Sequence, residues 1–478
     1  MKHDFDTIIN RKNTDCAKWD FGGYDHPMWV ADMDFKAAPK IAEAVEKRAG
    51  HNVYGYAIPP ERLFDAYINW WDRRYGIQMK REEMLFATGV MPAITSIIRS
   101  FSSIGDKVLI QSPVYHVFFY VIENNDREVI ENELIYENNI YHIDFEDREE
   151  KLALEDTKLM LLCNPHNPIG KIWDKESLEK IGRLCKKHGV ILVSDEIHCD
   201  LTNPGLKYVP FASLEEDIVE NSIITIAPSK TFNIAGLQSS MVYTVNEEFY
   251  SKIQNQLTWD FSSGANVFAI DSVIAAYNES EDWLEELREY LYENKQIVES
   301  FLKEEIPEIK FVESKATYLL WLDCSDLNIS SESFSEFLKE NVSLFLSPGA
   351  EFGKCGDNFM RMNVACPKEL LYGGLEALKE GIRILKEKIN LKYREIVSFI
   401  MKKSLLTLLG AGLLLTSCQS DEPFAPGEGG EKQVTFTLNV PGELGTRAAS
   451  GESGAQNNPD ANIYYTLVLD ANGDIQVW

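Results

Sequence analysis

Two ionisable side chains, Lys230 and Asp195, each follow a short apolar run, at the place where a buried strand would end. A lysine held beside an apolar pocket can form a Schiff base with a carbonyl group. A carboxylate at a strand end can pair with a protonated ring nitrogen, because a nearby opposite charge favours the charged form. Each has a plainer alternative: Lys230 could be an ordinary solvated lysine, and Asp195 could cap a helix N-terminus.

Two loops could bind other parts of the same ligand. Residues 163–170 (CNPHNPIG) hold two Asn-Pro steps and a glycine, which specify a rigid turn in which Asn167 could donate to a ring oxygen. Gly89 and Val90 precede a helix that we expect to begin near Pro92. Free backbone N–H groups and the positive helix end suit a phosphate there, although a Thr-Gly step before a helix is also a common cap.

Arg361 lies among alternating apolar residues in residues 359–365 (FMRMNVA). An inward arginine is costly unless it is paired. A substrate carboxylate would be a suitable bidentate partner. A structural salt bridge explains this motif equally well when it is taken alone.

The elements that must position these residues alternate along the chain. Continuous apolar strands between amphipathic helices predict an α/β fold with a mostly parallel sheet covered on both faces, followed by a smaller α+β domain. The strands expected in the larger part are residues 107–111, 159–163, 190–195, 222–227 and 241–244, and the helices are 92–101, 175–188 and 266–277.

The smaller part begins with a long amphipathic helix, expected over residues 281–305 and ended by Pro307. Further strands are expected at 309–312, 318–323, 343–346 and 359–364, with helices at 332–340 and 367–388. We divide the chain into an N-terminal segment that contributes to the small domain (1–50), a large domain (51–285), a small domain (286–396), a signal-like segment (401–418), and a strand-rich or disordered fragment (419–478).

In combination, this order of motifs resembles the fold-type I pyridoxal-phosphate (PLP) enzymes of the aminotransferase superfamily, over residues 10–395. More narrowly, it resembles the MalY/PatB group of cystathionine and cysteine-S-conjugate β-lyases. The narrower resemblance rests on Lys18-Trp19-Asp20 and on residues 27–35 (PMWVADMDF), 54–56 (YGY), 228–237 (PSKTFNIAGL) and 316–319 (ATYL).

The resemblance implies a role for each site residue. Lys230 would form the Schiff base with PLP, Asp195 would pair with its ring nitrogen, and Tyr115 would stack on the ring. Asn167 would contact the ring hydroxyl and the substrate carboxylate, which Arg361 would clamp near the Ala31 backbone. The phosphate would be bound by Gly89, Val90, Ser229 and Gln238 of the same chain and, in addition, by Tyr56 of a partner subunit. Ala227 and Gln238 stand where many aminotransferases have a serine and an arginine, so no phosphate-binding arginine is expected.

The implied reaction is β-elimination from an amino acid with sulfur on Cβ, which releases thiol, pyruvate and ammonia. Transamination uses the same residues and stays open as the alternative. A catalytically silent PLP-fold regulatory protein would be expected to lack Lys230 or Asp195, and both are present. The resemblance also implies a homodimer.

The composition bounds the remaining possibilities. The chain has 478 residues, 47 Lys and Arg against 75 Asp and Glu, and a formal charge of −28. This acidity argues against a general nucleic-acid binder. Eight scattered cysteines without a Cys-x-x-Cys pair argue against a zinc site and suit a reducing compartment. We therefore expect residues 1–400 to be cytoplasmic.

The last 78 residues have a different character. Met401-Lys402-Lys403 and the apolar run 405–415 match the start of a signal peptide, and residues 415–418 (LTSC) resemble a lipobox in which Cys418 is lipidated. Residues 434–440 and 463–470 weakly resemble the start of a fimbrillin-like lipoprotein. A short buried core helix is the alternative for the apolar run. Because export signals act at an N-terminus, we expect that two adjacent reading frames are joined here.

Overall fold

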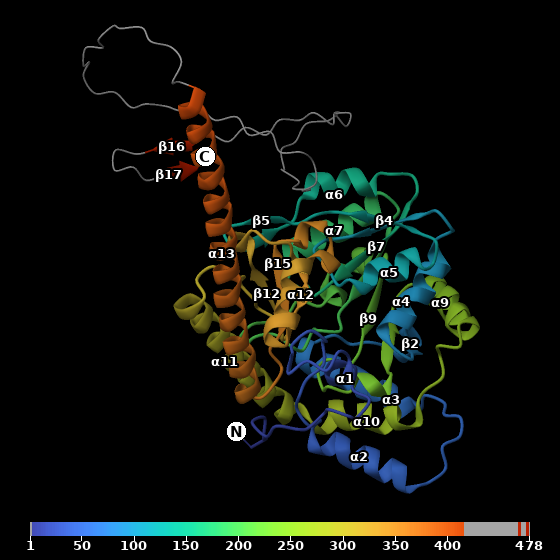
Figure 1. Cartoon of the computed structure of the whole chain (residues 1–478). Coiled ribbons are helices and arrows are strands. Elements are labelled where there is room, and N and C mark those ends of the chain that lie inside the picture. Colours follow the sequence, from blue (N-terminus) through green and yellow to red (C-terminus); the bar gives the residue numbers. More distant parts are fainter. Residues whose placement is uncertain (1, 415–466, 470–474, 478) are drawn as a thin grey trace. The chain divides into compact units, whose positions relative to one another are not determined.

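The structure is a computed structural model that describes residues 2–414, 467–469 and 475–477 (Figure 1). Contacts within the chain divide it into two compact units, Met1–Arg394 and Glu395–Trp478. The first unit carries every predicted site residue, and the two are described separately below.

A seven-stranded sheet forms the centre of the first unit, in the order β2-β10-β9-β8-β7-β3-β4. The five strands from β9 to β4 are parallel to one another, whereas β10 is antiparallel to both of its neighbours, β9 and β2. The mostly parallel sheet expected from the sequence is therefore confirmed. The strands are β2 (Met84–Ala87), β3 (Lys107–Ile110), β4 (Glu128–Glu131), β7 (Thr157–Cys163), β8 (Ile191–Asp195), β9 (Ser222–Ile226) and β10 (Ser240–Tyr243).

Helices cover both faces of this sheet. In β7, Leu159 and Leu161 pack into one core and Met160 and Leu162 into another, as the alternation of side chains along a strand requires. The first core is completed by α4 (Val90–Phe101), α5 (Val117–Glu123) and α9 (Glu247–Trp259). The second is completed by α3 (Glu61–Tyr75), α7 (Lys175–Lys187) and α10 (Val267–Glu279). Strands apolar on both faces are the cause of this layering.

A second sheet, antiparallel and four-stranded, has the order β11-β12-β15-β14. Its strands are β11 (Lys310–Phe311), β12 (Leu319–Asp323), β14 (Ser347–Pro348) and β15 (Phe359–Asn363). A third core joins them to α11 (Glu281–Glu305), α12 (Ser331–Val342) and α13 (Lys368–Leu414). The predicted smaller α+β part is thus present.

The N-terminal segment reaches this smaller part, because β1 (His26–Pro27) pairs in parallel with β13 (Leu344–Phe345). The α-helices and strands that remain in the first unit are α1 (Ala17–Asp20), α2 (Pro39–Gly50), β5 (Ile135–Glu137), β6 (Ile140–His142), α6 (Phe145–Leu152) and α8 (Glu216–Val219). The domain boundaries given above stay predictions.

The closing helix was predicted to end at Lys388, and this was wrong: α13 continues to Leu414. No proline interrupts residues 368–414, which are rich in Leu, Lys and Glu, so nothing in the sequence stops the helix. The second unit holds the end of α13 and a hairpin of β16 (Leu467–Leu469) and β17 (Ile475–Val477). The lipobox, Cys418 and residues 434–440 lie outside the described residues.

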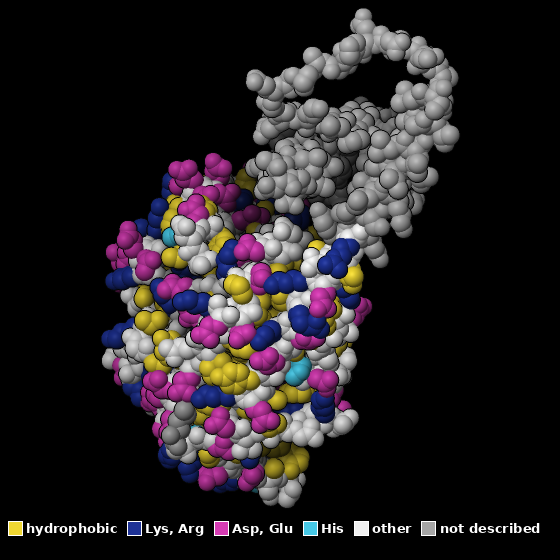
Figure 2. All heavy atoms as spheres, turned by 60° about the vertical axis from the view of Figure 1, so that its left-hand side comes forward, with side chains coloured by type: hydrophobic (Ala, Val, Ile, Leu, Met, Phe, Trp, Pro, Cys, Tyr) yellow, Lys and Arg dark blue, Asp and Glu magenta, His cyan; other side chains and the backbone are white. Residues whose placement is uncertain are grey.

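Acidic and basic side chains lie interspersed on the face of the molecule that Figure 2 shows. This part of the described surface presents mixed charge instead of a continuous basic field. Across residues 2–414, 467–469 and 475–477, no helix combines the length and the apolar character needed to cross a bilayer. In the same ranges, no cluster of three His, Cys, Asp or Glu side chains forms a possible metal site.

Candidate active site

Three parallel strands carry the predicted residues to one edge of the central sheet. Cys163, the last residue of β7, pairs with Asp195, the last residue of β8, and Asp195 pairs with Thr225 of β9. The loops that leave these strands therefore start side by side. The loops after β7 and β9 hold Asn167 and Lys230, and Asp195 ends the strand between them. Ligands of open α/β sheets bind at this carboxyl edge.

The Lys230 amine is held against the N-terminal segment. Its Nζ donates to the carbonyl oxygen of Ala31 at 2.6 Å, and the Tyr318 hydroxyl donates to the same oxygen at 2.9 Å. Burial lowers the pKa of the amine to about 8; Asp32 and Asp195 oppose this shift and Arg361 adds to it. A lysine with a pKa this close to neutrality can act as a nucleophile or a base.

Asp195 is 3% exposed, and its Oδ1 accepts a hydrogen bond from the backbone N–H of Ile197 at 3.2 Å. Burial raises the pKa of this carboxyl group to about 7, against the opposing effects of that hydrogen bond and of Lys230. A cation placed beside Asp195 would restore its charged form.

Arg361 lies in β15 and is also 3% exposed. Its Nη2 donates to the Trp29 carbonyl at 2.7 Å, and its Nη1 to Asn167 Oδ1 at 3.4 Å, while its buried Nε has no partner in the described chain. Burial lowers the pKa of the guanidinium to about 10. None of the ion pairs among the described residues includes Arg361, so the salt-bridge alternative is not what this fold shows.

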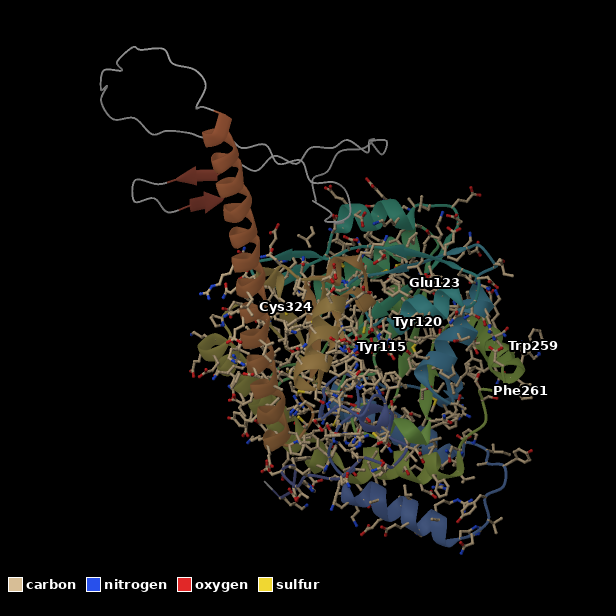
Figure 3. All side chains as sticks on the ribbon, viewed as in Figure 1. Tyr115, Tyr120, Glu123, Trp259, Phe261 and Cys324 are labelled. Carbon is tan, nitrogen blue, oxygen red and sulfur yellow. The ribbon has the colours of Figure 1, made fainter. Side chains whose placement is uncertain are left out.

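Asn167 and Tyr115 complete this group. Asn167 is buried and reaches Arg361 through its side-chain oxygen. Burial raises the pKa of Tyr115 to about 12, and Arg361 and Asp195 both lie near enough to influence it. Tyr115 lies in the loop between β3 and α5, and Figure 3 shows it near Tyr120 of α5. The structure therefore brings Lys230, Asp195, Asn167, Tyr115, Arg361 and Ala31 together.

Three of the predicted phosphate residues lie at or near the start of α4. Gly89 is the N-cap of this helix, Val90 begins it, and no side chain of the described residues caps it. Ser240 of β10 pairs with Ala87 of β2, so Gln238 and Gly89 each stand two residues beyond that antiparallel pair. Ser229 lies next to Lys230 in sequence, whereas the Gln238 side chain is exposed.

Tyr56 is the one predicted residue that this chain leaves apart from the rest. It is fully exposed, in the segment between α2 and α3. Such a position agrees with a residue that would serve another subunit.

Four further residues belong to this site and were given no role from the sequence: Asp32, His198, Tyr318 and Asn363. Burial lowers the pKa of His198 to about 3, and the nearby Lys230 and Arg361 add to the effect. Asn363 donates to the carbonyls of Val30 and Asp32 at 2.5 and 2.6 Å. Position relative to the motifs was the available signal, since His198 follows Asp195 by three residues and Asn363 follows Arg361 by two.

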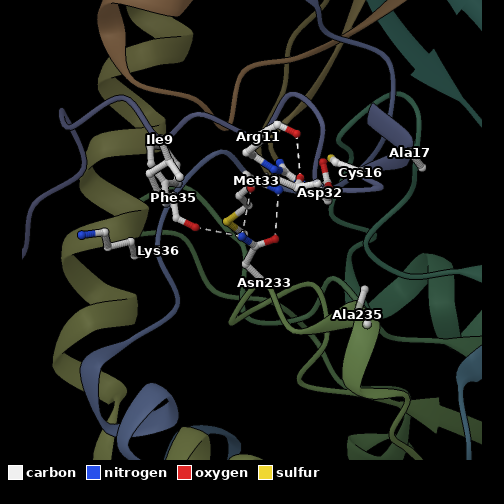
Figure 4. A pocket seen from close by; sticks show the side chains of 12 residues that line it. Ile9, Arg11, Cys16, Ala17, Asp32, Met33, Phe35, Lys36, Asn233 and Ala235 are labelled. Carbon is white, nitrogen blue, oxygen red and sulfur yellow. Dashed lines mark hydrogen bonds and ion pairs between the residues drawn. The ribbon is translucent and has the colours of Figure 1, made fainter. Parts of the chain in front are cut away.

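A cavity of about 580 Å³ lies between the N-terminal segment and the loop that follows Lys230 (Figure 4). Its lining includes Arg11, Asp32, Lys36 and Asn233 but none of the residues predicted from the sequence. We therefore place the reacting centre by the convergence of Lys230, Asp195 and Arg361, with the cavity beside it.

These groups fit PLP and an amino-acid substrate. Asp195 is a buried carboxylate with no cationic partner at hydrogen-bond distance among the residues that the structure describes, so it is free to pair with a pyridinium nitrogen. The uncapped start of α4 offers backbone N–H groups to a phosphate. The unpartnered Arg361 Nε leaves donor capacity for a carboxylate.

Comparison with known proteins agrees with this arrangement. A profile of the family "Aminotransferase class I and II" matches residues 28–378. The chain belongs to this family. It is 40% identical to cystathionine beta-lyase PatB of Bacillus subtilis over 384 residues, which cover 79% of this chain and 99% of that protein.

Two solved structures share the fold of this aminotransferase-family chain. A PLP-bound putative aminotransferase from Clostridium difficile has a TM-score of 0.78 at 38% identity, and cystalysin from Treponema denticola, which contains PLP, has 0.77 at 34%. Each alignment covers 80% of this chain and 100% of the other. The predicted fold, family and cofactor are thus confirmed.

Proposed function

We propose that the first unit is a PLP-dependent carbon–sulfur β-lyase that cleaves cystathionine or related cysteine S-conjugates to thiol, pyruvate and ammonia. One observation carries the proposal: Lys230, Asp195 and the unpaired, buried Arg361 converge at the carboxyl edge of the sheet. The 40% identity to a protein named cystathionine beta-lyase supports the lyase over the aminotransferase.

Asp195, Arg361 and Lys230 each have a defined task in this reaction. When bound, PLP supplies an electron sink for the electron pair released at the substrate's Cα. Asp195 holds a positive charge at the ring nitrogen, and Arg361 binds the α-carboxylate and so orients the Cα–H bond. Lys230 binds PLP in the resting enzyme and afterwards accepts the α-proton at Nζ as general base.

The burial of these groups matters for the rate. Arg361, Asp195 and Asn167 are each 3% exposed, so little water competes for their hydrogen bonds. Prearranged charges in a site of low dielectric cost little reorganisation when charge develops. Departure of a thiolate from Cβ then completes the elimination.

The decisive experiment incubates purified protein and PLP with L-cystathionine and measures pyruvate, thiol and ammonia together. A β-lyase forms all three without an added keto acid. Keto acid formed only when an acceptor is supplied would establish the aminotransferase alternative. No turnover and no cofactor absorbance band would reject the enzyme assignment.

We also propose that the enzyme is a homodimer in which Tyr56 reaches the phosphate of the partner subunit. The backbone bridge between Ala57 and Ala265 brings two exposed segments together. Trp259 is 75% exposed and Phe261 is 92% exposed, and Figure 3 shows them on the outside of the molecule near α9. Other exposed apolar side chains of these segments are Val53, Tyr54, Tyr56 and Ile58. Large apolar patches of this kind mark interfaces.

Sedimentation measurements on wild type and on a Trp259→Ser/Phe261→Ser variant test this interface. Wild type should sediment as a dimer and the variant should dissociate at micromolar concentration. A monomeric wild-type enzyme with full activity would contradict both the interface and the role of Tyr56.

For the tail, we propose that residues 401–418 are an export signal joined to a cytoplasmic enzyme by fusion of two reading frames. The Lys-Lys start, the apolar run and the lipobox-like residues before Cys418 support this interpretation. Mass spectrometry of the native protein decides: tryptic peptides that cross residues 392–402 would show one continuous chain and reject the proposal.

A further inference from the structure

The Lys230 amine is hydrogen-bonded to a segment that comes from another part of the fold. Within the described residues, Nζ of Lys230 makes one hydrogen bond, to the carbonyl oxygen of Ala31 at 2.6 Å. Lys230 belongs to the loop that follows β9 of the central sheet, whereas Ala31 belongs to the N-terminal segment. The position of the amine therefore depends on how this loop and this segment are held relative to each other.

Residues 29–35 of the N-terminal segment are tied to the second sheet by side chains. Arg361 and Asn363 of β15 donate to three carbonyl groups of this segment, and the Tyr318 hydroxyl, just before β12, donates to the Ala31 carbonyl. Residues 29–35 themselves form neither a helix nor a strand. The acceptor of the Lys230 amine is thus fixed to the second sheet, while the lysine itself is fixed to the first.

Asn233 provides a second connection between the Lys230 loop and this segment. Its Oδ1 accepts from the Met33 N–H at 3.0 Å, and its Nδ2 donates to the carbonyls of Met33 and Phe35 at 3.0 and 3.1 Å. Figure 4 shows these contacts beside the cavity. Within the described chain, Lys230 and Asn233 are the two residues of the loop 227–239 that hydrogen-bond to the segment. Asn233 therefore joins the loop to the segment independently of the lysine.

The amide of Asn233 and its backbone suit this connection. A primary amide has an acceptor oxygen and two N–H donors, and here both kinds of group bind the backbone of the segment. Asn233 has a φ of +56°, a left-handed conformation in which asparagine is enriched. The loop is compact at this point, because the Ile234 N–H donates to the Ser229 carbonyl at 3.0 Å and Phe232 is buried in the core. The amine and the amide thus extend from one tight turn.

We propose that Asn233 is a positioning residue for Lys230: it holds the segment that carries the Ala31 carbonyl against the loop of the lysine, and so orients the free amine. A hydrogen bond from one N–H to Ala31 restricts rotation of the amine about the Cε–Nζ bond, which restricts where its lone pair points. A base must be aligned with the Cα–H bond that it breaks. The inference rests on the proposed function in taking Lys230 as the base, and it applies to elimination and to transamination alike.

The first test uses the full chain without substrate. Hydrogen–deuterium exchange, read by mass spectrometry of peptides that cover residues 29–35, compares wild type with Asn233→Gly. Glycine accepts the left-handed backbone and removes the amide, so exchange in this segment should become about tenfold faster. Asn328→Gly is the matched control: Asn328 is exposed, has a φ of +50° and lies in the turn after β12, and its loss should leave this exchange unchanged. Unchanged exchange in Asn233→Gly would overturn the proposal.

The second test measures removal of the α-proton directly. The holoenzyme is incubated in D2O with L-alanine, which has no leaving group on Cβ, and NMR follows the loss of the α-proton signal. Rates are expressed per bound PLP, counted by absorbance, so that a loss of folded sites does not count as a loss of rate. Asn233→Gly should lower the saturated rate per site at least tenfold, since a small misplacement of a base costs that much. Asn328→Gly should keep the wild-type rate.

The dependence on substrate concentration separates positioning from binding. Arg361 and the bonds from β15 remain in Asn233→Gly, so the L-alanine concentration that gives half the maximal rate should stay within threefold of wild type. A change confined to that concentration would show that Asn233 acts on substrate binding and would overturn the positioning role. A wild-type rate per site, with fewer sites, would show a purely structural role and would overturn it too.

The two tests also separate the failure of this inference from that of the proposed function. If wild type forms no pyruvate from L-cystathionine but exchanges the α-proton of L-alanine, the lyase proposal fails while the exchange rates still decide on Asn233. If wild type exchanges no α-proton of either amino acid, the inference fails together with the base. If Asn233→Gly does not fold, Asn233→Asp carries both tests, because it keeps the size of the side chain and lacks the two donors. A wild-type rate per site in Asn233→Asp would then overturn the proposal.

Discussion

Arg361 offers the sharpest test of the site, because its charge is buried and no carboxylate of the described residues pairs with it. The perturbation is Arg361→Met, which keeps much of the side-chain length and removes the guanidinium. Among the described residues, the acceptors of the guanidinium are all neutral: the Trp29 carbonyl at 2.7 Å, and the Asn167 and Ser347 side-chain oxygens at 3.4 Å. A substrate carboxylate is thus the partner that would compensate its charge.

The expected magnitude follows from the bonds that the carboxylate would gain. A planar guanidinium can give a carboxylate two charge-assisted hydrogen bonds, each with a net value of about 1.5–3 kcal/mol. Losing both removes about 3–6 kcal/mol, which corresponds to a fall of about 10²–10⁴ in kcat/KM. Stability should change little, since Met removes a costly buried cation but also leaves the Trp29 carbonyl and the Asn167 oxygen without donors.

The assay is pyruvate formation from L-cystathionine by wild type, Arg361→Met and a control, Arg62→Met. Arg62 is exposed and paired with Asp271, so its loss should leave kcat/KM within twofold. PLP absorbance should be retained in all three proteins, because Arg361 is assigned to the substrate. An S-substituted cysteamine, which lacks the carboxylate, should react equally slowly with wild type and Arg361→Met.

Two results would refute this reasoning. If Arg361→Met kept kcat/KM within threefold of wild type, the carboxylate would have to bind elsewhere. If the variant also lost its cofactor absorbance or its folded thermal transition, the residue would be structural, as the salt-bridge alternative from the sequence supposed.

Three further predictions concern the same site. Lys230→Ala should abolish pyruvate formation and the absorbance of bound PLP while the thermal transition is retained; a variant that still showed the absorbance would remove Lys230 from its assigned role. Burial raises the pKa of Asp195 to about 7, so this group's contribution to apoprotein stability should be lost as the pH rises from about 4 to about 7. Asp195→Asn should flatten the slope of the free energy of unfolding against pH in that range. An unchanged slope would argue against a raised pKa of the Asp195 carboxyl group. Gly170→Ala should destabilise the fold by at least about 1 kcal/mol in urea unfolding, because Gly170 has a φ of +64° and an added Cβ would lie 2.4 Å from Ser314 Oγ and 2.9 Å from the Ala316 oxygen. If the Gly170→Ala variant unfolded at the same urea concentration as wild type, that prediction would be contradicted.

The central sheet was predictable because its strands are apolar on both faces. Apolar runs such as residues 159–163 fit a strand that has helices packed on both of its faces. A helix between two successive strands indicates that the strands run parallel. The half-buried edge strand β4 and the antiparallel partners β2 and β10 carry weaker signals. The end of α13 was missed because the sequence changes character near residue 400 while its helix propensity does not.

The site was predictable where chemistry and strand ends coincide. Asp195 and Asn167 follow adjacent parallel strands, so their meeting at one edge follows from topology alone. Arg361 was harder, because it comes from the other sheet, and sequence spacing says nothing about how that sheet meets the first. Arg361 is buried without a carboxylate partner among the described residues, and this favours its role in substrate binding. Such burial is visible only in the three-dimensional structure.

The contribution of the N-terminal segment was out of reach for a different reason. Its main contacts with the site are made by backbone carbonyl groups. Because every residue has a carbonyl group, the side-chain types at positions 29–33 do not predict these contacts. The donors are spread over residues 11, 230, 233, 318, 361 and 363, which no local pattern joins.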